Sequence, residues 1–336
     1  MVALYVVDVW LKYGRTEIFA DFGSGDNLRV VEPPQPSLDS SQSLDGVVGV
    51  LDAGQPVTLV VDYVAGLKGY LELLETLVDK LSINGFTPKD IEIRVTAWRY
   101  FSEHVERECI SEVASHLRRR GVEKISGLQP DQSEADILVS PAIFWGGGIT
   151  TVHRLEKVYT SIIPIISYGG AVAEILVGRP QDIGDRISEL VMQRSHLASE
   201  EAYDIIVLGG PGHPTDLYLS SSIHLISAVG ENVKDKVVII PLECSGGLGP
   251  QSFVDTLTKK VSDDIFGRWV GLWAERAEKN KICMVTATPS SLVEKLLGAR
   301  HADTLDQALT YAWRVKSKEA KILVLAQSLG SRLENI

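Results

Sequence analysis

The sequence has little cysteine and no long hydrophobic run. Its three cysteines, Cys109, Cys244 and Cys283, are far apart and odd in number, which excludes a disulfide framework and a paired metal-binding motif. No apolar stretch is long enough to span a membrane, and the opening residues, MVALYVVDVW, lack the basic start and the small-residue cleavage site of a signal peptide. We therefore expect reduced thiols, no membrane contact and a cytoplasmic location.

Positive charge is also scarce. The chain has 33 lysines and arginines against 44 aspartates and glutamates, a net charge of -11. An acidic surface of this kind repels nucleic acid unless a local basic patch overcomes it. The one basic run, Arg118-Arg119-Arg120, ends a predicted helix just before Gly121, where cations complement exposed carbonyl groups. We therefore expect no nucleic-acid partner.

Hydrophobic residues make up 45% of the 336 positions, enough for two domains that each have a core. Short apolar runs without polar alternation are followed by turns and amphipathic helices, which is typical of parallel sheets. We predict an α/β fold of two domains, residues 1–198 and 199–336, with mainly parallel, Rossmann-like sheets and a ligand crevice between them. Residues 2–11 and 16–22 predict an N-terminal β-hairpin, which we expect at an edge of the first domain.

The strands of both domains can be placed from their apolar runs. In the first domain, strand ends deliver several loops to one side of the sheet, and the last helix has the mixed charge of a solvated connection. Its predicted strands are 56–61, 91–97, 137–140 and 162–167, and its predicted helices are 67–81, 102–120 and 182–196. In the second domain we expect strands beginning at 203, 236, 281 and 321, with helices near 216, 251, 268, 290 and 303.

The most informative stretch contains two glycine-rich turns. A buried strand at 203–208 leads into GGPGHP, and the next strand, 236–242, leads into ECSGGLGP. Turns of this kind at the carboxyl ends of neighbouring parallel strands form the crevice in which open α/β sheets bind ligands. We therefore expect a small-molecule ligand here, with His213 of the first turn facing it.

A helix is predicted between these turns, over residues 215–230. Asp216, Ser220 and His224 lie four residues apart along it, and Ser221 lies three residues before His224, so all four share one face. This polar face is interpreted either as lining the crevice or as facing solvent. On the first interpretation Asp216, Ser220 and Ser221 would bind the ligand and His224 would be catalytic.

The segment GGPGHPTDLYLSSSIHLISAV followed by VVIIPLECSGGLGPQSF resembles the second domain of the nickel-dependent lactate racemase family. In that family a Gly-Gly-x-Pro-x-Asp helix segment precedes a strand and a Gly-x-Gly loop. Near the N-terminus, LKYGRTE is similar to the family's opening hairpin, and Glu32-Pro33-Pro34 to the linker after it. The resemblance covers most of the chain, and its motifs are specific for the fold rather than for the chemistry.

The resemblance also implies where catalytic groups should stand. In the family an arginine holds the substrate carboxylate, and it belongs to an Asp-x-Thr-Arg-Pro turn. This chain keeps Asp62 but has Val64, Ala65 and Gly66 in place of threonine, arginine and proline. An alanine cannot bind a carboxylate, so of this turn only Asp62 is carried over as a candidate ligand-binding residue.

Two further loops complete the comparison. Where the family has a catalytic histidine, this chain has Tyr100, which is therefore a candidate catalytic residue. The neighbouring Arg99 is a second candidate for ligand binding. A phenol with an ordinary pKa near ~10 is a poor base at neutral pH. The third loop keeps three glycines that could contact a ligand, but no lysine stands where the family attaches its nickel pincer nucleotide. These glycines are Gly146, Gly147 and Gly148.

These departures lead to a hypothesis and an alternative. We expect a lactate racemase-like protein that has lost the nickel-pincer residues, needs no cofactor or metal, and binds a small organic acid, a nucleotide or a partner chain in the crevice. The alternative is an active 2-hydroxyacid racemase or epimerase, loaded with the nickel pincer nucleotide and rebuilt from Tyr100, His153, Lys157 and His224. His153 is then either a relocated metal ligand or, more simply, a surface histidine. Homo-oligomers fit either hypothesis.

A nicotinamide dehydrogenase is a weaker interpretation. Gly209-Gly210-Pro211-Gly212 is not a Gly-x-Gly-x-x-Gly fingerprint, and no acidic residue ends the next strand in the manner that binds a ribose.

Overall fold

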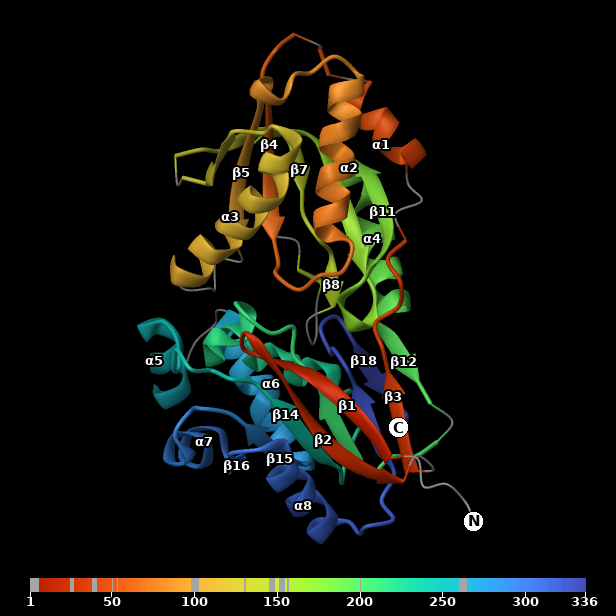
Figure 1. Ribbon diagram of the computed structural model, residues 1–336, viewed down its shortest axis with the longest axis vertical. Helices are drawn as coiled ribbons and strands as arrows, with labels where there is room; N and C mark the ends of the chain where they lie inside the picture. Colours follow the sequence, from red (N-terminus) through yellow and green to blue (C-terminus); the bar gives the residue numbers. More distant parts are fainter. Residues whose placement is uncertain are drawn as a thin grey trace.

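A computed structural model gives the fold of this chain in two lobes (Figure 1). It describes residues 6–24, 27–37, 41–49, 51–52, 54–97, 103–129, 131–144, 149–150, 155, 157–199, 201–259 and 265–336. Each lobe is built on a six-stranded sheet, so the predicted α/β fold with mainly parallel sheets is confirmed. In the described ranges, no helix is both long and apolar enough to cross a membrane.

The first sheet has the strand order β11-β10-β7-β4-β5-β6. Its neighbours are parallel except for β10 and β11, which are antiparallel. Helices α1, α2 and α3 share a core with one face of this sheet, and α4 packs on the other face. The bounds are β4 Val57–Tyr63, β5 Ile91–Ala97, β6 Lys124–Gly127, β7 Glu134–Val139, β10 Lys157–Ile166, β11 Val172–Gly178, α1 Ser41–Val48, α2 Tyr70–Ile83, α3 Glu103–Leu117 and α4 Pro180–Ser195.

The second sheet is parallel throughout, in the order β16-β15-β14-β13-β17-β3. Four helices accompany it, and α6 and α8 pack on opposite faces. The bounds are β3 Leu28–Val31, β13 Ile205–Leu208, β14 Val237–Pro241, β15 Lys281–Val285, β16 Arg300–Ala302, β17 Ile322–Leu325, α5 Gln251–Lys259, α6 Ile265–Lys279, α7 Ser290–Leu297 and α8 Leu305–Val315.

Short elements complete the fold. Strands β8 (Ile143–Phe144) and β9 (Ile149–Thr150) pair with each other, as do β12 (His196–Ala198) and β18 (Arg332–Glu334). The 3₁₀ helices are Pro88–Asp90, Arg118–Arg120, Tyr168–Gly170, Thr215–Leu217, Leu219–Ser221 and Ile223–Ala228.

The N-terminal hairpin forms as predicted, from β1 (Val6–Tyr13) and β2 (Thr16–Ser24). Its alternation directs Val9, Leu11 and Phe22 into a core shared with α8 and the second sheet. The expected position at an edge of the first domain is therefore wrong. The apolar face of a hairpin must be buried, and here the second sheet offers the matching surface.

The chain crosses between the lobes more than once. Strand β3 follows the hairpin and pairs with β17 in the second sheet, although it precedes every strand of the first sheet. The predicted domain boundary at residue 198 can therefore apply only to the part of the chain that follows β3. For that part it remains a prediction. The carboxyl ends of both sheets point at each other (Figure 1), and contacts join them: Gln327 Nε2 donates to the Gly66 carbonyl oxygen at 3.0 Å.

The prediction of one continuous helix over residues 215–230 is wrong. Three short 3₁₀ helices occupy this stretch instead. The hydroxyls of Ser221 and Ser222 both donate to the carbonyl oxygen of Thr215, at 2.6 and 2.9 Å. Serine side chains that bond to the local backbone compete with the helical ladder, and this explains why a helix does not form here.

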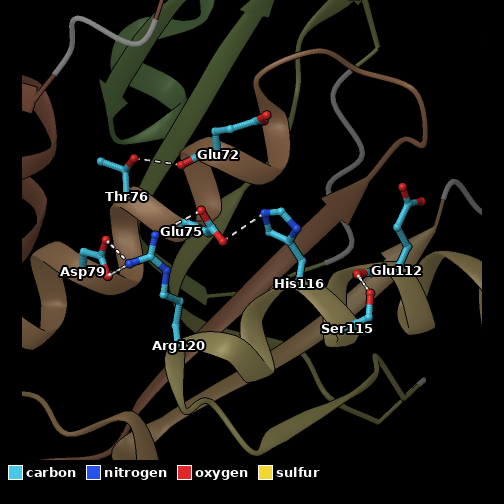
Figure 2. A network of polar contacts seen from close by, with 8 residues as sticks. All are labelled: Glu72, Glu75, Thr76, Asp79, Glu112, Ser115, His116 and Arg120. Carbon is cyan, nitrogen blue, oxygen red and sulfur yellow. Dashed lines mark hydrogen bonds and ion pairs between the residues drawn. The ribbon is translucent and has the colours of Figure 1, made fainter.

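Helices α2 and α3 are joined by a polar network on their outer surface (Figure 2). The Glu75 carboxylate lies 3.1 Å from His116 and 3.2 Å from Arg120, and Arg120 also lies 3.0 Å from Asp79. Exposed pairs of this kind contribute about 0–1 kcal/mol each. They connect α2 to the C-terminal end of α3 and to the turn after it, and α3 also carries Glu108.

Candidate functional site

The candidate site lies where the carboxyl ends of the two sheets meet. Gly66, after β4, approaches the turn after β13 so closely that a Cβ on it would lie 2.8 Å from the Cβ of Pro211. The Thr215 hydroxyl contacts the Ala65 carbonyl oxygen at 3.5 Å. The turns after β4 and β13 therefore meet, and the two lobes touch there.

Asp62 is a buried carboxyl group on the first-lobe side. It is 2% exposed, near the end of β4, and its carboxylate accepts a hydrogen bond from the Ser140 hydroxyl at 2.6 Å. Burial raises the pKa of Asp62 to about 7, and the Ser140 hydrogen bond opposes that rise. A carboxyl with a pKa near neutrality can either take up or release a proton at physiological pH.

Tyrosines fix this end of β4. The Tyr70 hydroxyl donates to the Asp62 carbonyl oxygen at 2.7 Å. Tyr63, 2% exposed, forms a hydrogen bond with Glu112, and burial followed by the Glu112 charge raises its pKa. Both phenols therefore stay protonated and act as fixed hydrogen-bonding groups.

Glu108 on α3 gathers side chains from several elements into what we call the rim cluster: Arg15, His104, Glu108 and His213. The Glu108 carboxylate lies 3.3 Å from the Arg15 guanidinium at the hairpin tip. It lies 3.6 Å from His213 Nε2, in the turn after β13, and 3.8 Å from His104 Nε2 on its own helix. The cluster therefore spans the first lobe, the hairpin and the second lobe.

The hairpin tip is locked onto the second lobe beneath the rim cluster. Gly14 N–H donates to Asp216 Oδ2 at 2.7 Å, and its carbonyl oxygen accepts from the His213 N–H at 2.9 Å. Gly14 has a φ of +57°, and a Cβ there would lie 1.9 Å from the Glu243 carboxylate, so glycine is favoured at this position. Asp216 is fully buried, and burial raises its pKa.

The remaining candidates from the predicted polar face lie inside the second lobe. Ser220, Ser221 and His224 are at most 1% exposed, so the interpretation of this face as solvated is wrong. The His224 ring lies 5.2 Å from the Trp269 ring, and burial holds its pKa well below the ordinary value. Ser220 packs against Gly249, whose Cβ would lie 2.1 Å from the serine hydroxyl oxygen. These three side chains do not join the rim cluster.

Several predicted site residues fall outside the described ranges. They are Arg99, Tyr100, Gly146, Gly147, Gly148 and His153.

Lys157, one of the residues of the rebuilt site, lies at the wrong end of the first lobe. It begins β10 and pairs with Glu134 at 2.6 Å. β10 is parallel to β7, whose far end leads to Ser140. A strand advances about 3.3 Å per residue, and β10 has 10 residues. Lys157 is therefore far from Asp62, and a site that includes both is excluded.

The sequence analysis missed Arg15, Glu108, Ser140 and Glu243. Ser140 and Glu243 had a signal, since each follows a buried strand at the end where ligands bind. Arg15 and Glu108 had none, because a charged residue in a hairpin turn or on a helix is usual at any surface.

Comparison with known proteins bears on the fold. The sequence matches no protein-family model and no curated protein. Among solved structures, the lactate racemase apoprotein from Thermoanaerobacterium thermosaccharolyticum is similar with a TM-score of 0.63 and 13% sequence identity, covering 98% of this chain and 100% of that chain. This chain has a lactate racemase-like fold. Identity this low shows the fold alone and does not carry the activity across.

The described residues give no support for a nickel site. Among them, no group of three or more His, Cys, Asp or Glu side chains is placed to hold a metal ion. Ala65, at the position of the substrate-binding arginine in the resemblance, is 1% exposed and its carbonyl contacts Thr215. A guanidinium would have little room there, so the family's substrate-binding arginine has no counterpart at this position. No step of a mechanism is derived through nickel, because the described residues offer no fitting set of ligands.

Proposed function

We propose that this chain binds a small organic acid between its lobes, at the rim cluster. The observation that carries the proposal is the convergence of one guanidinium and two imidazole rings on Glu108. Arg15, His104 and His213 approach this one carboxylate from separate elements. An incoming carboxylate can take over the Arg15 guanidinium, and charge-assisted hydrogen bonds of this kind are about twice as strong as neutral ones.

Asp62 supports the proposal from the first-lobe side. Its pKa of about 7 means that a neutral carboxyl is accessible near neutral pH. A neutral carboxyl donates a hydrogen bond to an anion instead of repelling it. The buried Ala65 in turn supports a binding mode different from that of the racemase family, without its arginine.

Calorimetric titration tests the proposal. D-lactate, L-lactate and a panel of other small 2-hydroxyacids are titrated into the wild-type protein and into Arg15→Gln. We expect saturable binding by the wild type and affinity at least about tenfold weaker in the variant, corresponding to about 1.4 kcal/mol. Arg186→Gln is the matched control, because Arg186 pairs with Glu189 on the outer surface of α4.

Two results would contradict the proposal. One is the absence of saturable binding across the panel, and the other is equal affinity in the wild type and Arg15→Gln. A nucleotide or a partner chain captured in place of an acid would redirect the proposal to that ligand.

An active 2-hydroxyacid racemase or epimerase is the second candidate, favoured by the same Asp62 pKa near neutrality. A group that exchanges protons at neutral pH is suited to move the proton on Cα. In D2O, the protein would then incorporate deuterium at Cα of its substrate as Asp62 takes the Cα proton and a deuteron is returned, and Asp62→Asn would abolish this exchange. No exchange with any acid that binds would refute this candidate.

Location and assembly remain proposals as well. We propose a cytoplasmic protein that acts alone or as a homo-oligomer and that contacts neither nucleic acid nor membrane. The net charge of -11 supports the part of this proposal that concerns nucleic acid, which an acidic surface repels. Size-exclusion chromatography with light scattering tests the assembly state.

A further inference from the structure

A cavity lies on the second lobe, and its lining includes no residue of the rim cluster. It has a volume of about 400 Å3 and lies between α8 and the edge strand β16. This volume is within the range of small-molecule sites, roughly 300–1,000 Å3. On α8 its lining follows the spacing i, i+3, i+4 and i+7, so one continuous helical face borders it. These positions are Gln307, Thr310, Tyr311 and Arg314.

Two arginines line this cavity, one from each side. Arg300 comes from β16 and Arg314 from the last turn of α8. Within the part of the chain that the structure describes, neither guanidinium lies within 4.0 Å of a carboxylate, in contrast to Arg15, Arg120 and Arg186. Among the described residues, two arginines without a carboxylate partner therefore line one cavity, in a chain of net charge -11.

The other titratable groups in the cavity do not cancel this charge. Asp306 lies in the first turn of α8, about two helical turns, or ~12 Å along the axis, from Arg314. His301 Nε2 lies 3.1 Å from the Thr286 carbonyl oxygen and so is engaged with the backbone. Cys283 is buried, and burial raises its pKa to about 12, so it stays a neutral thiol.

Arg300 is also held in place. Its guanidinium carbon lies 5.8 Å from the centre of the Tyr311 ring, a distance at which the ring face attracts a cation. Its backbone pairs with Cys283 of β15. An arginine oriented in this way loses less freedom when it binds an anion than one on an unrestrained surface.

We propose that this cavity binds a small molecule that carries a phosphate group. The guanidinium groups of Arg300 and Arg314 donate hydrogen bonds to the phosphate oxygens, and the Thr310 hydroxyl donates a further hydrogen bond. Phosphate is favoured over carboxylate because a tetrahedral dianion accepts two guanidinium forks from different directions, whereas one fork satisfies a carboxylate. The cavity has room for more than the phosphate, so the occupant is a phosphomonoester rather than the free ion.

Titration with defined probes tests this proposal. Glycerol phosphate, inorganic phosphate and acetate are titrated calorimetrically at low ionic strength into the wild type, Arg300→Gln, Arg314→Gln and Thr310→Val. We expect saturable binding of glycerol phosphate, weakened at least about tenfold by each arginine variant and several-fold by Thr310→Val. Asp306→Asn should tighten it, because a like charge is removed from the cavity.

Arg119→Gln is the matched control. Arg119 is exposed on the first lobe. It does not line the cavity and does not belong to the rim cluster, so Arg119→Gln should leave the binding of glycerol phosphate unchanged. Loss of affinity equal to that of Arg300→Gln would show a general charge effect and overturn the proposal. Absence of saturable binding at millimolar glycerol phosphate, or inorganic phosphate binding as tightly, would also overturn it. Thermal unfolding confirms that every variant is folded.

Discussion

The Ser140 hydroxyl donates to the Asp62 carboxylate at 2.6 Å, across 78 residues of sequence. This contact joins the carboxyl ends of β7 and β4 and opposes the rise in the Asp62 pKa that burial causes. Ser140→Ala should therefore raise the Asp62 pKa above about 7, since the hydrogen bond that favours the charged form is lost. Carbon-13 NMR of the aspartate carboxyls measures it. Ser115→Ala, on the outer surface of α3, is the control and should leave that pKa unchanged.

Stability should fall with rising pH because of Asp62. Its pKa rises from an ordinary 3.8 to about 7 on folding, so between these values the folded state holds a proton that the unfolded state has released. The contribution of Asp62 to stability is therefore complete below about pH 3.8 and is lost progressively up to about pH 7. Above that pH it does not change further. The loss is on the order of 4 kcal/mol.

Asp62→Asn tests this pH dependence. Asparagine does not titrate, so the fall in the free energy of unfolding between about pH 5 and about pH 8 should be smaller in the variant than in the wild type. Urea unfolding at both pH values measures it. An equal fall in the two proteins would show that other groups cause the effect.

The three thiols should be inert in the folded protein. Cys109, Cys244 and Cys283 are buried, and burial raises the pKa of each, to about 12 for Cys109 and Cys283. Little thiolate exists at about pH 8, and the thiolate is the reactive form. Ellman's reagent should therefore detect no thiol in the native protein and all of them in denaturant. A fast-reacting thiol in the native state would contradict this burial.

Gly66→Ala should destabilise the contact between the lobes. Gly66 has a φ of +85°, and a Cβ there would lie 2.8 Å from the Cβ of Pro211 in the other lobe. Gly54→Ala is the matched control, because Gly54 has a φ of +98° but nothing within 4 Å of its Cβ. We expect Gly66→Ala to cost about 1–3 kcal/mol more than the control, measured by chemical unfolding. An equal loss of stability in Gly66→Ala and Gly54→Ala would mean that backbone strain at positive φ causes the loss, without a contribution from the contact with Pro211.

The strand and helix pattern was predictable because it depends on local periodicity. Strands β4, β5, β13 and β14 are short apolar runs buried on both faces of parallel sheets, and such runs are recognisable without knowledge of their neighbours. The turn of the N-terminal hairpin at Gly14 was predictable in the same way, from the local sequence. The helix over 215–230 failed because the bonds of Ser221 and Ser222 to the Thr215 carbonyl outweigh a helical spacing that is otherwise regular.

The sequence by itself therefore determined the α/β fold, the hairpin and the edge at which the glycine-rich turns meet. Only the tertiary structure decided that the hairpin packs on the second sheet and that Arg15 and His213 converge on Glu108. The physical reason is that periodicity tells which face of an element is apolar but not which surface will cover it. Contacts between charges that are distant in the chain follow from that choice of surface.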